Sequence, residues 1–156
     1  MIKAYQGYLI KLFLKKILII SIIFLTLVII LSIFEEISFF KNSDNNVLLP
    51  FFLTLLNAPS ILFEIFPFIF LISTQFFFLE LINKKELEVF KLNGLDNLKI
   101  IYTLFFTSMV LGILLVAFYY SLSSKLKYLY IDIKNNYSND NKYLAVVTEN
   151  GLWIKD

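Results

Sequence analysis

The sequence predicts a membrane protein built mainly from α-helices, with three transmembrane helices followed by the first strands of a β domain. Three observations lead to this fold class. The chain of 156 residues is 59% hydrophobic, with a mean hydropathy of +0.78, well above the balance of a soluble domain. Its charges gather in short segments between long uncharged runs. Its last residues instead show the turn signals and β-branched residues that are typical of strands.

Composition argues against several classes of function. The chain has no cysteine and no histidine, so it offers no disulfide, no thiolate or imidazole metal site and no Ser-His or Cys-His catalytic pair. Its four glycines are scattered, and no phosphate-binding G-x-x-x-x-G-K-[ST] motif occurs. A net charge of +2 is too small to indicate a nucleic-acid partner. We therefore expect no catalytic residue, metal or cofactor, and no enzyme activity in this chain.

The first span is predicted at about residues 10–35. Residues 17–34 carry no charge, which is about the minimum for a transmembrane helix, and the preceding turns extend it. The run ends in the acidic pair Glu35 and Glu36, whereas a signal peptide would end in small residues at its cleavage site. We therefore expect this first span to remain uncleaved.

The second apolar stretch, residues 51–82, is too long for one upright span. We interpret it as a short lead-in helix at the membrane surface and a span at about 59–82, because Pro59 suits the first turn of a helix. Pro67 would then kink this span. Glu64 would cost about 2.5–3.5 kcal/mol deep in lipid, so we expect it at the outer boundary or facing a wet cavity.

A charged segment separates the second and third spans and predicts a short helix at about 84–94. Leu87 and Phe90 lie on one side of such a helix, and charged residues such as Glu88 lie on another. Gly94 suits the end of the helix. Two interpretations remain open from the pattern: an ordinary charged turn, or a coupling helix that sits in a groove on a moving partner.

The third span is predicted at about 99–124, where residues 100–124 carry no charge. The lysines then predict the orientation. Four precede residue 17 and four lie in the 83–99 segment, whereas the polar loop at 41–50 has only one, so the N-terminus and the 83–99 segment are predicted to be cytoplasmic. Five lysines after residue 124 oppose this rule, but the two clusters that agree outweigh them.

These spans divide the chain into a transmembrane region, 1–125, and a tail, 126–156, on the outer side. The tail is predicted to continue the third helix to residue 137, turn at 138–141 and form strands at 143–148 and 152–154. Two strands are not stable alone in water. We therefore expect the chain to be a fragment of a longer protein.

Several motifs occur in a recognisable order along the whole chain. They are the acidic pair after the first span, Phe66-Pro67, the segment from Lys85 to Gly94, and Gly151-Leu152-Trp153-Ile154-Lys155-Asp156. This order resembles the N-terminal half of the LptF/LptG (YjgP/YjgQ) permeases. The last motif and Asn57-Ala58-Pro59 favour the LptG side. The resemblance implies a six-span inner-membrane subunit with a periplasmic β-jellyroll, of which the tail would be the truncated start.

The resemblance also implies function and partners. The family's transporters extract lipopolysaccharide from the inner membrane for transport to the outer membrane. The implied partners are a cytoplasmic ABC ATPase dimer, a sister LptF-type permease and a periplasmic jellyroll partner of the LptC or LptA kind. In the coupling helix, Glu86 would meet a basic residue of the ATPase, Leu87 and Phe90 would fill an apolar groove, and Gly94 would end the helix.

The candidate substrate-cavity residues lie at the outer ends of the first two spans. They are Ser32, Glu35, Glu36 and Glu64. Family members often carry basic residues at the end of the first span, where an anionic head group gains most from them. This chain has an acidic pair there, so phosphate contacts would come from elsewhere, or the cargo would be less anionic.

Two alternatives to lipopolysaccharide export remain open. One is a membrane scaffold or assembly protein that binds a periplasmic partner without transport. The other is a permease of another ABC export family, with the same coupling helix and a different cargo.

Overall fold

The computed structural model describes residues 4–40 and 48–137, and the backbone of residues 145–148 and 151–154. The elements in chain order are α1 (Ala4–Phe39), α2 (Leu48–Glu64), α3 (Phe66–Asn83), α4 (Glu86–Leu92), α5 (Asn97–Leu114), the π-helical turn η1 (Leu115–Tyr119), α6 (Tyr120–Tyr137), β1 (Ala145–Thr148) and β2 (Gly151–Ile154).

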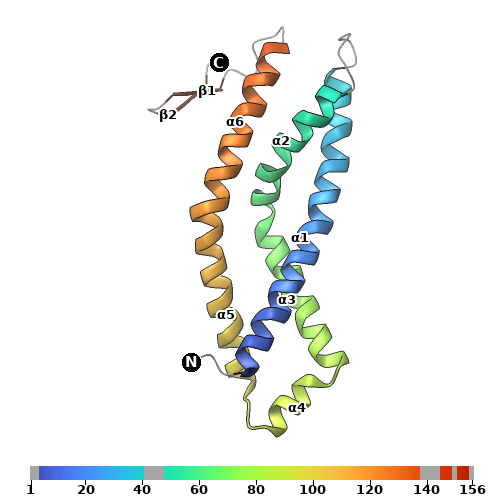
Figure 1. Cartoon of the computed structure of the whole chain (residues 1–156), viewed down its shortest axis with the longest axis vertical. Coiled ribbons are helices and arrows are strands. Elements are labelled where there is room, and N and C mark those ends of the chain that lie inside the picture. Colours follow the sequence, from blue (N-terminus) through green and yellow to red (C-terminus); the bar gives the residue numbers. More distant parts are fainter. Residues whose placement is uncertain (1–3, 41–47, 138–144, 149–150, 155–156) are drawn as a thin grey trace.

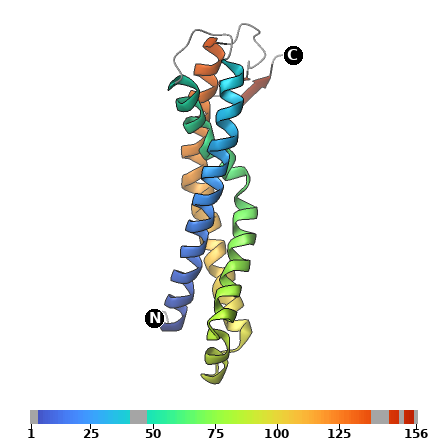
Figure 2. The same ribbon diagram turned by 90° about the vertical axis from the view of Figure 1, so that its right-hand side faces the viewer.

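The helices form one elongated bundle (Figures 1 and 2). α1 runs along its length, α2 and α3 return beside it, and α5, η1 and α6 form one continuous helical line. The start of α1 and α4 lie at one end, here called the inner end, and the end of α6 lies at the other, the outer end. Among the described residues, three helices are long and apolar enough to cross a membrane: Ala4–Phe39, Phe66–Asn83 and Asn97–Tyr137. The predicted mainly helical membrane fold is therefore confirmed.

The core lies where α1 packs on α3. Phe13 and Phe77 are fully buried and meet edge to face, with ring centroids 5.7 Å apart. α5 contributes Ile100 and Leu104 to this core. On its other face, Ile101, Phe105 and Met109 are 51%, 67% and 55% exposed. An apolar helix surface of this kind suits contact with lipid, because lipid chains and aliphatic side chains are equally apolar.

The second apolar stretch breaks at Ile65, six residues later than the predicted start of its span. α2 continues through Pro59, and Pro67 lies in the first turn of α3. Pro67 has no N–H to bond to the carbonyl of Phe63, and its ring crowds that carbonyl, so α2 ends before it. Sequence analysis could not tell which of Pro59 and Pro67 begins the second span, because each suits the first turn of a helix.

The third helical line contains a wider turn, η1, opposite this break. The ring of Tyr119 stacks on Phe63 with centroids 6.2 Å apart and lies 6.4 Å from the ring of Phe66. Its hydroxyl donates a hydrogen bond to the carbonyl of Pro59, at 3.2 Å. Two irregular turns, one in each helical line, therefore lie side by side.

The chain after α6 contains two short antiparallel strands in the part that the structure describes. β1 pairs with β2 so that Ala145 lies opposite Ile154 and Thr148 opposite Gly151. The predicted strands at 143–148 and 152–154 overlap them, whereas the predicted turn at 138–141 lies outside the described residues. That these strands belong to a jellyroll stays a prediction.

Candidate functional site

The charged segment between the second and third spans forms α4, which is shorter than the predicted 84–94. Lys85 precedes it with φ of 56°, and Gly94 follows it with φ of +75°. The N–H of Gly94 bonds to the carbonyl of Lys91 at 3.0 Å, and the N–H of Leu95 bonds to that of Phe90 at 2.9 Å. This is the Schellman arrangement, in which a left-handed residue, usually glycine, ends a helix.

Glu86 is held by the first helix of its own chain. The hydroxyl of Tyr8 donates a hydrogen bond to the two carboxylate oxygens of Glu86, at 2.8 and 2.9 Å. The ring of Tyr8 also lies 6.4 Å from the ring of Phe90. Tyr8 was absent from the sequence-based candidates, because it lies 78 positions from Glu86 and no local pattern links the two.

The two faces of α4 differ in what they contact. Leu87 and Phe90 are half-buried and pack against the apolar core of the bundle. On the other face, Val89 is 52% and Leu92 88% exposed, beside the exposed Glu88. Of the predicted coupling residues, Glu86, Leu87 and Phe90 thus lie on the inward face of α4, whereas Gly94 is exposed after its end. Val89 and Leu92 were not among the sequence-based candidates. They are identified by their exposure in the structure.

A cluster of charges ties α1 to α3 near the inner end. Lys16 of α1 forms an ion pair with Glu80 of α3, and Lys84 reaches the same carboxylate at 2.6 Å. The hydrogen bond to Glu80 raises the pKa of Lys84 above its usual value. The pairs compensate the charge of Glu80 close to an apolar span.

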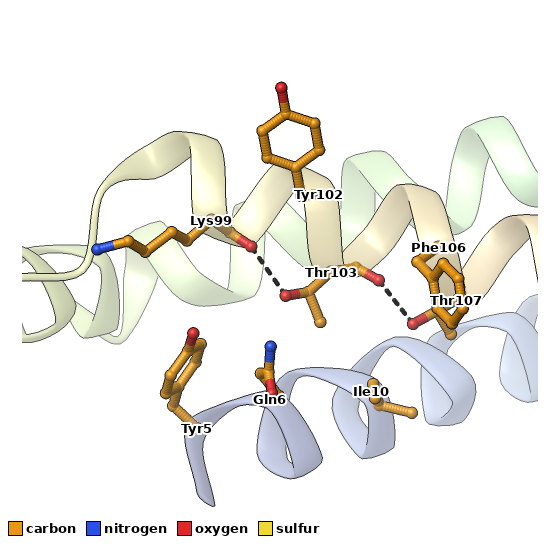
Figure 3. Close-up of a pocket in the computed structure, with 8 residues that line it drawn as sticks. All are labelled: Tyr5, Gln6, Ile10, Lys99, Tyr102, Thr103, Phe106 and Thr107. Atoms are coloured by element: carbon orange, nitrogen blue, oxygen red, sulfur yellow. Dashed lines mark hydrogen bonds between the residues drawn. The ribbon is translucent and has the colours of Figure 1, made fainter. Parts of the chain in front are cut away.

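A pocket of about 410 Å³ lies between the first turns of α1 and α5 (Figure 3). The hydroxyls of Thr103 and Thr107 donate to helix carbonyls one turn earlier, at 2.8 and 2.7 Å. The amine of Lys99 is directed toward the segment before α5, where it lies 3.3 Å from the carbonyl of Gly94. The pocket is lined by Tyr5, Gln6, Ile10, Lys99, Tyr102, Thr103, Phe106 and Thr107.

At the outer end, Glu36 forms a buried charge cluster with α6. It is 2% exposed, and one oxygen accepts hydrogen bonds from the hydroxyl of Tyr130 at 2.7 Å and from the amine of Lys134 at 2.8 Å. Lys134 is 8% exposed, lies 2.6 Å from the Tyr130 hydroxyl and stands 4.7 Å above the ring of Phe39. The other oxygen of Glu36 has no hydrogen-bond partner among the described residues.

The structure does not gather the four substrate-cavity candidates around one cavity. Ser32 is buried one helical turn before Glu36, on the same face of α1, whereas Glu35 is exposed. Glu64 lies at the end of α2, pairs with Lys127 of α6 at 3.3 Å and lines a separate pocket of about 360 Å³ beside the Ile65 break. Within residues 4–40 and 48–137, no group of acidic side chains is placed to hold a metal ion.

The chain matches the model of a known protein family. The model of the family described as lipopolysaccharide export system permease LptF/LptG matches residues 7–156. No curated protein and no solved structure matches the chain.

Proposed function

Because the chain belongs to the LptF/LptG family of lipopolysaccharide export system permeases, we propose that it is a permease subunit driven by a separate cytoplasmic ABC ATPase. The family and the three long apolar helices make it a multi-pass protein of the inner membrane and a component of a transporter rather than an enzyme. In this proposal, it extracts lipopolysaccharide from the inner membrane for transport to the outer membrane.

The observation that carries the ATPase contact is the exposed face of α4. This helix lies at the inner end with the start of α1, beyond the apolar helices (Figure 1). There, the side chains of Val89 and Leu92 are exposed next to the charged Glu88 and Lys91. Apolar residues on the outer face of a short helix suit a hydrophobic groove on another protein. The lysine distribution supports a cytoplasmic location for this end.

The resemblance implied that Glu86, Leu87 and Phe90 contact the ATPase, and we propose instead that they act on the inward face of α4. Glu86 binds Tyr8, and Leu87 and Phe90 pack on the core, so they link the helix to the spans. Gly94 ends the helix with a left-handed turn. In this arrangement the ATPase contacts Val89 and Leu92, and Glu86, Leu87, Phe90 and Gly94 fix α4 to the rest of the permease.

At the outer end, the exposed candidates suit contact with cargo better than the buried ones. Glu35 and Glu64 are accessible, whereas Ser32 and Glu36 are buried, and Glu36 is bonded to α6. We assign Glu35 and Glu64 to the rim of the cargo path and Ser32 and Glu36 to the contact between α1 and α6. Acidic residues on this rim favour phosphate contacts from another subunit.

The finer assignments rest on the resemblance. Asn57-Ala58-Pro59 and the Gly151–Asp156 motif favour an LptG-like subunit beside a sister LptF-type permease. The strands β1 and β2 would belong to a periplasmic jellyroll that passes lipopolysaccharide to an LptC-like or LptA-like partner.

The proposed ATPase contact is tested by placing a charge on the exposed face of α4. Leu92→Asp should reduce ATPase co-purification from the complete transporter by about tenfold or more. The substitution removes an apolar side chain that the ATPase would bury and puts a charge in its place. Leu98→Asp is the matched control, since Leu98 is 62% exposed at the same end but lies on α5. Equal ATPase retention in the two variants would contradict the proposed docking face.

A further inference from the structure

We propose that Tyr8 is the positioning residue that transmits movement of α4 to α1. The inference rests on the proposed function, in which an ATPase moves α4, and it adds the route by which that movement enters the spans. By chain connection alone, α4 is attached to α3 and α5 through short turns. Its attachment to α1 is instead non-covalent. Leu87 and Phe90 pack on the shared core, and the hydrogen bond between the two helices is made by Tyr8.

The Tyr8 contact combines a charge-assisted hydrogen bond with a ring contact. The hydroxyl lies 2.8 and 2.9 Å from the carboxylate oxygens of Glu86, and the ring lies 6.4 Å from the ring of Phe90. Glu86 and Phe90 are one helical turn apart, so Tyr8 contacts one face of α4 at two points. Two points of contact oppose both sliding and rotation of α4 relative to α1.

From Tyr8, the contacts continue along a single helix. Phe13 lies just beyond it and packs on Phe77 of α3, and Lys16 pairs with Glu80 one turn later. α1 has 36 residues without a break, about 54 Å of helix, and ends beside the buried pair of Glu36 and Lys134. A displacement applied at Tyr8 is therefore carried by a continuous helix to the outer end.

The pocket in Figure 3 bears on how the contact of Tyr8 with α4 positions the first turns of α1. Tyr5, Gln6 and Ile10 face α5 across a space of about 410 Å³, so these side chains leave a gap beside α5. Leu9, on the same turns of α1, is buried in the core. On the α4 side, the start of α1 is held by Tyr8. The first turns of α1 thus have room to move toward α5 when α4 moves.

Tyr8→Phe tests the inference, because it removes the hydroxyl and keeps the ring. In the assembled transporter, reconstituted into vesicles that contain lipopolysaccharide, we expect the lipid released per ATP hydrolysed to fall by about threefold, the scale of one hydrogen bond. ATPase co-purification should be unchanged. Tyr5→Phe is the matched control, a lost hydroxyl on the preceding turn of α1. An unchanged ratio in Tyr8→Phe, or an equal fall in Tyr5→Phe, would overturn the inference.

A double substitution tests whether Tyr8 acts through Glu86. Glu86→Ala should lower the same ratio, and adding Tyr8→Phe should lower it no further, because the bond is already absent. Independent, multiplying losses would mean that Tyr8 acts in another way and would overturn the inference. Leu92→Asp in the same assay distinguishes failure of the proposed function from failure of the Tyr8 inference. ATPase retained there contradicts the proposed function, whereas ATPase lost there with a normal Tyr8→Phe variant contradicts only the inference.

Discussion

At the scale of single residues, α6 forms two ion pairs that have the same chemistry and differ in their contribution to stability. The side chains of Lys134 and Glu36 are 11% and 3% exposed, whereas those of Lys127 and Glu64 are 41% and 63% exposed. The second pair is exposed on the bundle, so it contributes little to stability. The first pair has lost its water, so each charge depends on the other.

Removing Lys134 should therefore be far more costly than removing Lys127. Lys134→Ala leaves Glu36 buried without its cation and should lower the free energy of unfolding by about 3–5 kcal/mol. Lys127→Ala should change it by no more than about 1 kcal/mol. Denaturant unfolding in detergent micelles measures both. Similar losses in the two variants would show that Glu36 is not isolated from water.

Sequence analysis identified the acidic member of each of these two pairs but neither of the partners. Glu36 and Glu64 are conspicuous because carboxylates are rare near apolar spans. Their partners lie 98 and 63 positions away, and only the packing of α6 on α1 and α2 brings them together. Tyr8 has no signal of its own, since a tyrosine near the start of a membrane helix is ordinary.

At the scale of elements, α4 is bounded by two residues with left-handed backbone. Lys85 before it has φ of 56°, and Gly94 after it has φ of +75°. Each interrupts the helical backbone, so α4 is a separate helix from α3 and α5. For lysine this conformation is strained, whereas for glycine it is ordinary.

Gly94→Ala should loosen the end of α4 through backbone strain alone. A Cβ at Gly94 would meet nothing within 4 Å, so the expected cost of about 1 kcal/mol comes entirely from the left-handed φ. Hydrogen exchange at the amides of Gly94 and Leu95 should become about fivefold faster, because these amides close the helix. Gly94→Asn should have a smaller effect, and the same rate in both variants would contradict this explanation.

Sequence patterns predicted the existence and type of these elements better than their limits and faces. Uncharged runs were enough to find the three spans, and Gly94 was enough to end a short helix near it. The helix begins at Glu86 rather than at residue 84, because Lys85 leaves the helical region, which no propensity predicts. Spacing placed Leu87 and Phe90 together but could not tell the bundle's own core from a partner's groove.

At the scale of the whole molecule, charge pairs mark the two ends of the bundle. In α1, Lys16 pairs with α3 and Glu36 with α6. The helix between them is about 30 Å long, which is the thickness of the hydrocarbon core of a bilayer. The part of α1 between the two pairs is therefore long enough to cross a bilayer.

Cysteine labelling tests the orientation. A cysteine at Asn93, exposed after α4, should react with a membrane-impermeant reagent only from the cytoplasmic side. One at Asn136, exposed at the end of α6, should react only from the periplasmic side. If the cysteines at Asn93 and Asn136 both react from the same side, the predicted arrangement of three spans is wrong.

The Ile65 break and η1 lie side by side, so the α2–α3 pair and the α5–α6 helix each have an irregular turn there, and α1 has none. The stacked rings of Phe63 and Tyr119 hold the two turns in register. We expect α2 and α6 to swing together about these turns while α3 and α5 keep their places. α1 would then move as one rigid helix, and its pivot would lie at the level of Tyr119.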